Sequence, residues 1–205
     1  MSGLNGFFES CSDGRTGSDG RTDGSVLAIS GNGGRPLPAA VVLTDEMIRS
    51  AEEKVPYTNV NRTVASRIDT LTGLLGEYAF AQYLYGDWRM NRAEENRGRE
   101  DFDGVEVKTS AFPYSDRLHL LVREDYAAKR KPSYYVQIII DVPDRKAESI
   151  ASGTVAYICG YATSAEVDDA PKRDFGSKRG GDGGYRCHYI PLGRLHPISE
   201  FGPVH

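Results

Sequence analysis

The sequence predicts a mixed α/β domain in which helices flank a central β-sheet. Two helical stretches come early, at residues 44–55 and 71–86. Several β-like runs follow, and the strongest is 134–142, where aromatic and β-branched residues predominate and Gln137 is the interruption. The length of 205 residues suits one domain with a substantial core and is barely enough for two. We therefore expect one α/β core built around one sheet.

The first expected helix begins after Thr44, whose hydroxyl can cap it, while Asp45 and Glu46 suit the positive end of its dipole. An apolar stripe at helical spacing follows, and Pro56 is expected to end the helix. The stripe consists of Met47, Ile48, Ala51 and Val55.

The second expected helix is apolar on nearly every side. Residues 71–86 read LTGLLGEYAFAQYLYG, with Glu77 as the only charged residue, which predicts a helix that is buried almost all round. An isolated ionised carboxylate is costly in such a place unless it is paired or binds a metal ion. Glu77 is therefore a candidate functional residue. The alternative is that it reaches the surface or pairs with Arg89, Arg97 or Arg99.

The remaining elements follow from β-rich runs and turn residues. Residues 1–38 are expected to be a disordered leader, because their repeated SDGRT and their Gly/Ser/Asp-rich context cannot bury a core. A strand at the brief apolar patch 26–29 is the open alternative within it. The domain then spans 39–205. Expected strands lie at 87–90, 105–111, 119–122, 134–142, 155–162 and 185–191, with a charged connection at 91–100. A helical turn or loop at 125–131, a short helix at 164–170, a glycine-rich basic stretch at 172–184 and a closing turn at 192–195 complete the chain.

A short hairpin is expected around Asp103-Gly104, since this dipeptide between extended stretches favours a tight turn with positive φ at both positions. With that turn, Asp101 faces Glu106 across the hairpin, and Lys108 projects to the same side because side chains alternate along a strand. Directly opposed side chains have Cβ atoms roughly 5 Å apart, so the two carboxylates would repel each other. A divalent cation between them would explain the pattern.

The arrangement Asp101 … Glu106-Val107-Lys108 resembles the active-site hairpin of the PD-(D/E)XK nuclease superfamily. Glu77 matches the acidic residue that many members carry on the preceding helix. The resemblance covers roughly residues 70–110 and implies a restriction endonuclease-like core. The chain departs from the family pattern in two ways: no proline precedes the aspartate, and the gap from Asp to Glu is short. The short gap leaves open whether Asp103 takes the place of Asp101, although the pairing geometry favours Asp101.

The resemblance implies a metal-dependent hydrolase that uses Mg²⁺ or Mn²⁺. Asp101 and Glu106 would be metal ligands, together with the backbone carbonyl of Val107, and Glu77 would hold a second ion or a coordinated water. Lys108 would orient the attacking water and offset the developing negative charge. The ordinary alternative for Lys108 is an ion pair with Glu106 or Asp101.

Further residues are candidates for substrate contacts. Gln137 lies on a later strand that could reach the same site, and the alternative is a hydrogen-bonded core residue. Thr109 and Ser110 could donate to a phosphate, and Arg97 and Arg99 could pair with backbone phosphates. Other basic clusters occur at 129–131 and 172–179, and Tyr134, Tyr135 and Tyr185 could stack on bases; solvated faces are the alternative.

Composition restricts the class of protein. A formal net charge of −4 is not that of a protein that coats nucleic acid indiscriminately, so we expect a narrowly basic cleft, or a partner protein that delivers the substrate; a homodimer stays open. No stretch reaches the length of a membrane span, so no membrane partner is expected. Three cysteines, an odd count, without a secretion signal favour a cytoplasmic protein with reduced thiols.

The sequence thus predicts a metal-dependent nuclease that hydrolyses phosphodiester bonds, with DNA as the expected substrate. The alternative is a catalytically inactive nucleic-acid-binding or assembly protein with a nuclease-like fold, and a protein-interaction domain is a third reading. DNA versus RNA, endonuclease versus exonuclease, substrate structure and pathway stay open.

Overall fold

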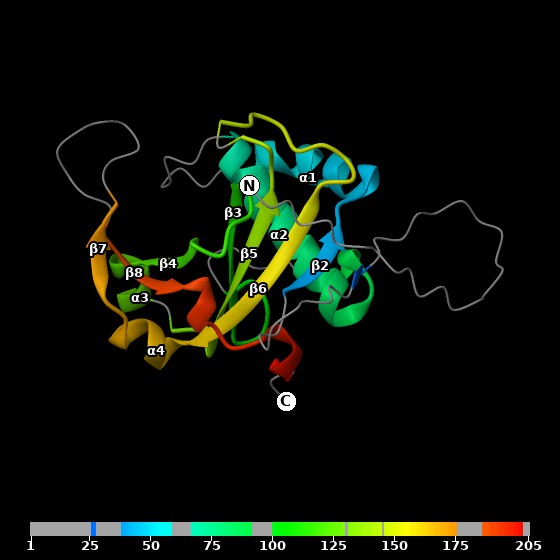
Figure 1. Cartoon of the computed structure of the whole chain (residues 1–205). Coiled ribbons are helices and arrows are strands. Elements are labelled where there is room, and N and C mark those ends of the chain that lie inside the picture. The colour runs from blue at the N-terminus through cyan, green and yellow to red at the C-terminus, as the bar shows by residue number, and fades with distance from the viewer. Residues whose placement is uncertain are drawn as a thin grey trace, which may run out of the picture.

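A mixed five-stranded sheet forms the centre of the molecule (Figure 1). The computed structural model describes residues 26–27, 38–58, 67–91, 100–129, 131–144, 146–175 and 186–202. Strands β3 and β5 run parallel, and the other neighbouring strands pair antiparallel. The mixed α/β class expected from the sequence is confirmed. The strand order is β1 (Val26–Leu27), β2 (Ala39–Val42), β6 (Val155–Thr163), β5 (Tyr134–Asp141) and β3 (Val105–Phe112).

A second sheet corrects the expectation of a single one. It has three antiparallel strands, β4 (His119–Arg123), β8 (Arg186–Pro191) and β7 (Lys172–Asp174). The sequence pattern did not separate the sheets because the composition of a strand does not show which strand it pairs with, and only the pairing partners distinguish the sheets. Residues 172–174, expected in a glycine-rich loop, form the edge strand β7.

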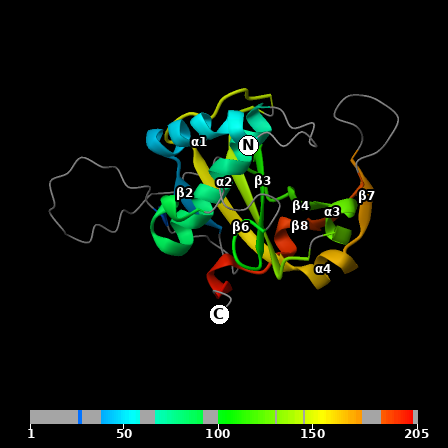
Figure 2. The ribbon, with the colours of Figure 1, turned by 180° about the vertical axis from the view of Figure 1, so that it is seen from behind.

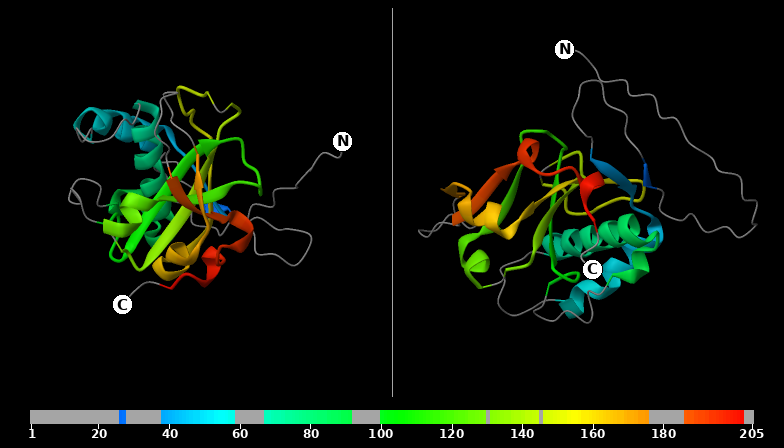
Figure 3. Two further views of the ribbon diagram at one scale, coloured as in Figure 1. Left: turned by 90° about the vertical axis from the view of Figure 1, so that its left-hand side faces the viewer. Right: turned by 90° about the horizontal axis from the view of Figure 1, so that it is seen from below.

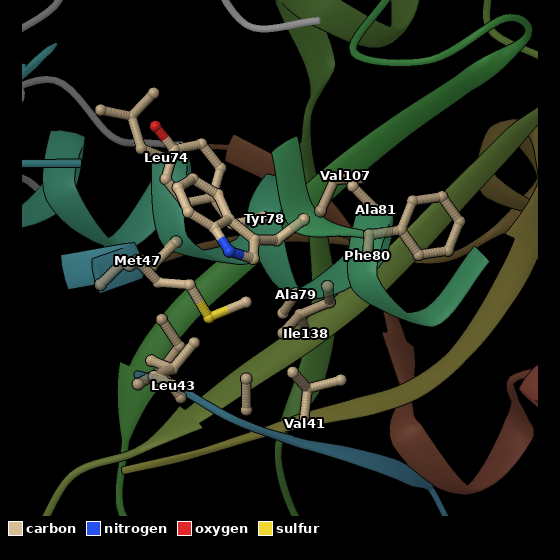
Figure 4. Packing of buried hydrophobic residues seen from close by; sticks show 14 of the residues in the cluster. Val41, Leu43, Met47, Leu74, Tyr78, Ala79, Phe80, Ala81, Val107 and Ile138 are labelled. Atoms are coloured by element: carbon tan, nitrogen blue, oxygen red, sulfur yellow. The ribbon is translucent and has the colours of Figure 1, made fainter. Parts of the chain in front are cut away.

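Two long helices, α1 (Asp45–Thr58) and α2 (Arg67–Tyr85), cover one face of the five-stranded sheet (Figure 2). Their buried side chains join those of β3, β5 and β6 in the main core, where Tyr78, Phe80 and Ile138 are fully buried (Figure 4). Phe80 packs edge-on against Phe102, with ring centroids 5.1 Å apart. Burying such rings is a large favourable term in folding, so this face anchors the fold.

Helix α1 begins as expected: the Thr44 hydroxyl accepts a hydrogen bond from the Met47 N–H, at 3.2 Å. Its end differs, because Pro56 lies inside the helix, which continues to Thr58. Proline has no backbone N–H to donate to the preceding turn, but Pro56 lies in the last turn, where little helix remains to be disrupted.

Helix α2 approaches β3 closely at one glycine. A Cβ atom added to Gly76 would lie 1.8 Å from the Thr109 hydroxyl oxygen on β3, so no larger residue fits without a shift. The next residue along α2 is Glu77. The close approach therefore determines how near this carboxylate lies to the motif strand.

The opposite face of the five-stranded sheet packs against the three-stranded sheet and two short helices, α3 (Glu124–Lys129) and α4 (Ser164–Asp169) (Figure 3). A second, smaller core lies between them. Thr163 and Glu166 form a capping box at the start of α4. The members of this core are Leu120, Val122, Ala127, Tyr135, Ala162, Val167 and Ile190.

The short strand expected at 87–90 is wrong: this stretch is the 3₁₀-helix η1 (Trp88–Met90). The Asp87 carboxylate caps it by accepting from the Arg89 N–H at 3.0 Å. Trp88 is buried against Tyr78, with ring centroids 4.9 Å apart, and burial of the indole ring determines the path of the chain here. Two further 3₁₀-helices, η2 (Leu192–Arg194) and η3 (Ile198–Glu200), follow β8.

Several expected segments lie outside the described residues: nearly all of the leader 1–38, most of the connection 91–100 with Arg97 and Arg99, and residues 176–185 of the basic stretch. Within the leader, Val26–Leu27 form the edge strand β1, which pairs with β2, so this part of the leader is not disordered. Among the described helices, none combines the length and the apolar character needed to cross a membrane.

Candidate functional site

The motif strand β3 is entered through a tight turn at Asp103-Gly104. Phe102 and Val105 exchange both backbone hydrogen bonds, at 3.1 and 2.9 Å, as expected for a two-residue turn. Of the two turn residues, Gly104 has a positive φ, at +72°, and Asp103 does not, since no non-glycine residue of the described chain has one; the expectation of positive φ at both positions is therefore wrong. A single left-handed residue at the second turn position is the requirement of a type II turn, which glycine meets without strain.

Asp101 lies beside Val107 at the outer edge of β3, which we call the free edge because no strand of the described residues pairs with it. The Val107 N–H donates to Asp101 Oδ2 at 2.8 Å, whereas the Gly104 carbonyl accepts from Tyr134 on the β5 side. The N–H and C=O groups of one strand residue point the same way, so the Val107 carbonyl is also directed to this free edge. The Asp101 carboxylate and the Val107 carbonyl therefore share one edge. Asp103, the alternative aspartate, is exposed at the turn.

Glu106 and Lys108 project from the face of β3 that is turned away from α2. Val105 and Val107 belong to the main core, so the alternating residues face the other way. Lys108 Nζ lies 2.7 Å from Glu106 Oε1, and the side chains are 28% and 13% exposed. The second Glu106 oxygen is buried and has no hydrogen-bond partner among the described residues. The ion pair that the sequence left open for Lys108 is thus present.

Glu77 lies close enough to these groups to be affected by their charges. Burial raises the pKa of its carboxyl group well above the ordinary value, and the negative charges of Asp101 and Glu106 raise it further. Lys54 and Lys108 act in the opposite direction, although more weakly. Four sequence-predicted residues, Glu77, Asp101, Glu106 and Lys108, therefore gather around one edge of the sheet.

The chemistry of this donor set fits a hard divalent cation. Carboxylate and carbonyl oxygens are the ligands that Mg²⁺ prefers, and Glu106 retains a buried oxygen without a partner. The geometry is not that of a preformed cage: in the described part of the chain, no three Asp, Glu, His or Cys side chains are placed to hold one ion together. One Glu106 oxygen is also bonded to Lys108. Binding an ion here would require these side chains to rearrange.

Gln137 lies in register with Lys108 on the neighbouring strand, as expected for a residue that reaches the same site. Its side chain is 1% exposed and donates to the Ile138 carbonyl at 2.9 Å. Tyr135 is likewise in register with Glu106. Burial, with the Glu106 charge as a second cause, raises the pKa of Tyr135 to about 12.

The other residues expected to contact the substrate differ in where they lie relative to Glu106 and Lys108. Thr109 lies against Gly76, with its hydroxyl oxygen buried on the opposite face from Glu106 and Lys108, so a contact between this hydroxyl and a phosphate is not supported. Ser110 follows Lys108 on the same face by alternation. Arg97 and Arg99 lie outside the described residues.

Two residues near the site escaped sequence reasoning. Lys54 comes from α1 and lies over the Tyr78 ring at 5.3 Å, and Tyr126 on α3 lies 5.9 Å from the Lys108 ammonium group. Their distance from the motif along the chain hid both of them. The one local signal for Lys54 in the sequence is that it directly precedes Val55, a member of the apolar stripe that is buried in the structure.

Acidic partners occupy Arg89, which was a possible partner of Glu77, and two residues of the basic clusters considered for phosphate contacts. Arg89 pairs with Glu46 at 2.7 Å, Lys172 pairs with Glu124 at 2.8 Å, and Lys131 pairs with Asp168. These pairs are partly exposed and contribute little to stability.

Comparison with known proteins adds no family: the chain matches no protein-family model, and no curated protein or solved structure is significantly similar to it.

Proposed function

We propose that the protein is a metal-dependent nuclease of the PD-(D/E)XK type that hydrolyses phosphodiester bonds in DNA. The observation that carries the proposal is the meeting of Glu77 with Asp101 and Glu106, from a helix, a turn and a strand. The sequence alone marks the same three carboxylates, two in the motif and one on the preceding helix. Like charges gathered in a buried place lower the stability of the fold. Carboxyl groups whose pKa is perturbed in this way concentrate at functional sites.

Each residue has a distinct role in this proposal. Asp101, Glu106 and the Val107 carbonyl would hold a Mg²⁺ or Mn²⁺ ion, and Glu77 would add a further carboxylate. The ion, when bound, would polarise the scissile phosphate and lower the pKa of a bound water. Lys108, released from its pair with Glu106, would orient the attacking water and offset the charge that develops on the phosphate oxygens.

A second candidate function is nucleic-acid binding without hydrolysis, on a nuclease-like fold. The observation that favours it is the Glu106–Lys108 ion pair at 2.7 Å, which occupies both motif residues with each other. If that pair persists when divalent ions are present, the site has a structural role only.

The experiment that tests the proposal is cleavage of labelled linear, circular, branched and single-stranded DNA with Mg²⁺ or Mn²⁺. Wild type is compared with Glu106→Gln and Lys108→Met, each of which keeps the approximate shape of the side chain. Glu200→Gln is the matched control, since Glu200 is an exposed carboxylate in the C-terminal η3.

The proposal expects metal-dependent cutting by wild type and by Glu200→Gln, with a loss of about 100-fold or more in the two motif variants. Equal cutting by wild type and Glu106→Gln would contradict the assignment of the site. Binding of DNA by a folded wild type that cuts none of these substrates would favour the second candidate.

A further inference from the structure

One face of the three-stranded sheet carries aromatic and arginine side chains. Alternation turns Leu120, Val122 and Ile190 toward the smaller core, so that their neighbours face the other way. On this outer face Arg123 of β4 and Arg173 of β7 flank Cys187 of β8 in one row of the register. Tyr189 is paired with Leu121 in the next row on the same face.

The aromatic rings on this face are in contact with one another. Arg173 lies 5.7 Å from the Phe175 ring, and the centroids of Phe175 and Tyr189 are 6.2 Å apart. Tyr189 in turn meets His119 edge-on, at 5.5 Å. Phe175 is 40% exposed, and Arg173 is exposed with no carboxylate ion pair among the described residues. The Phe175 ring and the Arg173 guanidinium group are therefore accessible to a ligand here.

Two contacts with the Tyr126 ring link this face to the candidate site. Arg123 lies 4.9 Å from the Tyr126 ring, and the ammonium group of Lys108 lies 5.9 Å from the same ring. Tyr126 thus connects the motif lysine to the outer face of the sheet, whose strands lie beside α3 in Figure 1. We call this surface the aromatic–arginine track. It comprises Tyr126, Arg123, Arg173, Phe175, Tyr189 and His119.

We propose that the aromatic–arginine track binds an unpaired DNA strand that extends from the hydrolytic site, so that the substrate has a single-stranded segment next to the cut. The inference rests on the proposed function in that Lys108 marks where the strand begins. Single strands expose the faces of their bases, which stack on aromatic rings and guanidinium planes, whereas a duplex hides those faces inside its own stack. Arg173 supplies charge that is complementary to the phosphates.

Local acidic groups limit how strongly this surface attracts any polyanion. Arg123 forms two 2.8 Å hydrogen bonds to Asp125, so its charge is largely offset while its plane stays over Tyr126. The complementarity is therefore that of stacking more than of charge. We expect modest salt dependence and a clear preference for single strands over duplex of the same sequence.

The test uses the full chain with Glu106→Gln, which removes cleavage without removing any residue of the track. Fluorescence anisotropy measures the binding of a labelled single strand, of its duplex, and of a duplex with a single-stranded extension. Phe175→Ala and Arg173→Ala are then added separately. Tyr57→Ala is the matched control, because Tyr57 is an aromatic residue 87% exposed on α1.

The proposal expects single strands and the extended duplex to bind more tightly than the plain duplex. Phe175→Ala should weaken single-strand binding about tenfold, within the range for loss of one stacked base. Phe175→Tyr should restore it, and Tyr57→Ala should leave it unchanged. Equal binding of single strand and duplex, or no loss in Phe175→Ala and Arg173→Ala with unchanged circular dichroism spectra, would overturn the proposal.

Failure of this inference can be told apart from failure of the proposed function. If wild type cuts DNA while the track variants bind single strands normally, the nuclease assignment stands and the track does not. If the track variants lose single-strand binding and wild type cuts nothing, the track stands and the protein is a binding module.

Discussion

The two faces of the five-stranded sheet differ in what their side chains do, and β3 contributes to both. Toward α1 and α2, Val105 and Val107 join a continuous apolar core. Toward the three-stranded sheet, Glu106 and Lys108 form an ion pair, with the buried amide of Gln137 on the adjacent strand. A period of two along one strand thus separates residues that hold the fold together from residues that are available for chemistry.

The comparison also shows how the polar face can be tolerated. Charged groups in partly buried positions cost free energy, and a core as well packed as that around Tyr78 and Phe80 can offset the cost. Substitutions on the apolar face should therefore act chiefly on stability. Substitutions on the polar face should act chiefly on activity, with small effects on stability.

The largest stability effect is expected on the apolar face. Phe80→Ala should lower the free energy of unfolding by about 3–5 kcal/mol, because the ring is fully buried and its removal leaves a cavity next to Phe102. Urea denaturation followed by circular dichroism measures the change. A loss below about 1 kcal/mol would mean that this face does not anchor the fold.

The next effect concerns the contact between α2 and β3. Gly76→Ala should cost about 1–3 kcal/mol, since the new methyl group would overlap the Thr109 side chain. Gly73→Ala is the matched control in the same helix, because its Cβ would meet nothing within 4 Å. That substitution should stabilise the protein by up to about 1 kcal/mol through helix propensity. Equal urea midpoints for the two variants would contradict the close approach.

A smaller effect is expected for the ion pair on the polar face. Lys108→Met should lower stability by about 1 kcal/mol, because Glu106 keeps its charge without its cation in a partly exposed place. The double variant with Glu106→Gln should recover most of the loss, as a double-mutant cycle in urea would measure. An additive double variant would show that the two side chains do not interact.

The pH dependence of stability sharpens the comparison further. With a chelator present, the raised pKa of Glu77 means that the native state holds a proton between the ordinary value of 4.5 and the raised value, whereas the unfolded chain does not. The free energy of unfolding should therefore fall as the pH rises through this window. Glu77→Gln should remove that fall and be the more stable protein above the window. An unchanged pH profile would show that Glu77 is not perturbed.

Local patterns predicted much of the fold, but not its assembly. The cap at Thr44, the buried helix around Glu77 and the turn at Asp103-Gly104 depend on neighbouring residues, and the structure contains all three. The second sheet depends on pairing between β4 and β8, which are far apart in the sequence. Likewise, the η1 helix depends on burial of Trp88 against Tyr78, a tertiary contact that no local pattern contains.

The residues of the candidate site likewise divide into those that a local pattern predicts and those that only tertiary contacts bring there. Alternation placed Glu106 and Lys108 on one face, and the apolar surroundings singled out Glu77 as an unusual carboxylate. Lys54 and Tyr126 were missed, because each reaches the site through a different helix. The burial of the Thr109 hydroxyl against Gly76 could not be predicted either, because the spacing of residues along the sequence does not give the distance between a helix and a strand.

The measurement that tests the central claim most directly is Mn²⁺ binding to wild type, Glu106→Gln and Glu200→Gln by isothermal titration calorimetry, which needs no knowledge of the substrate. The account predicts saturable binding to wild type and to Glu200→Gln, and its loss in Glu106→Gln while that variant stays folded. No binding to wild type, or equal binding to all three proteins, would contradict a divalent-metal site on the polar face of β3.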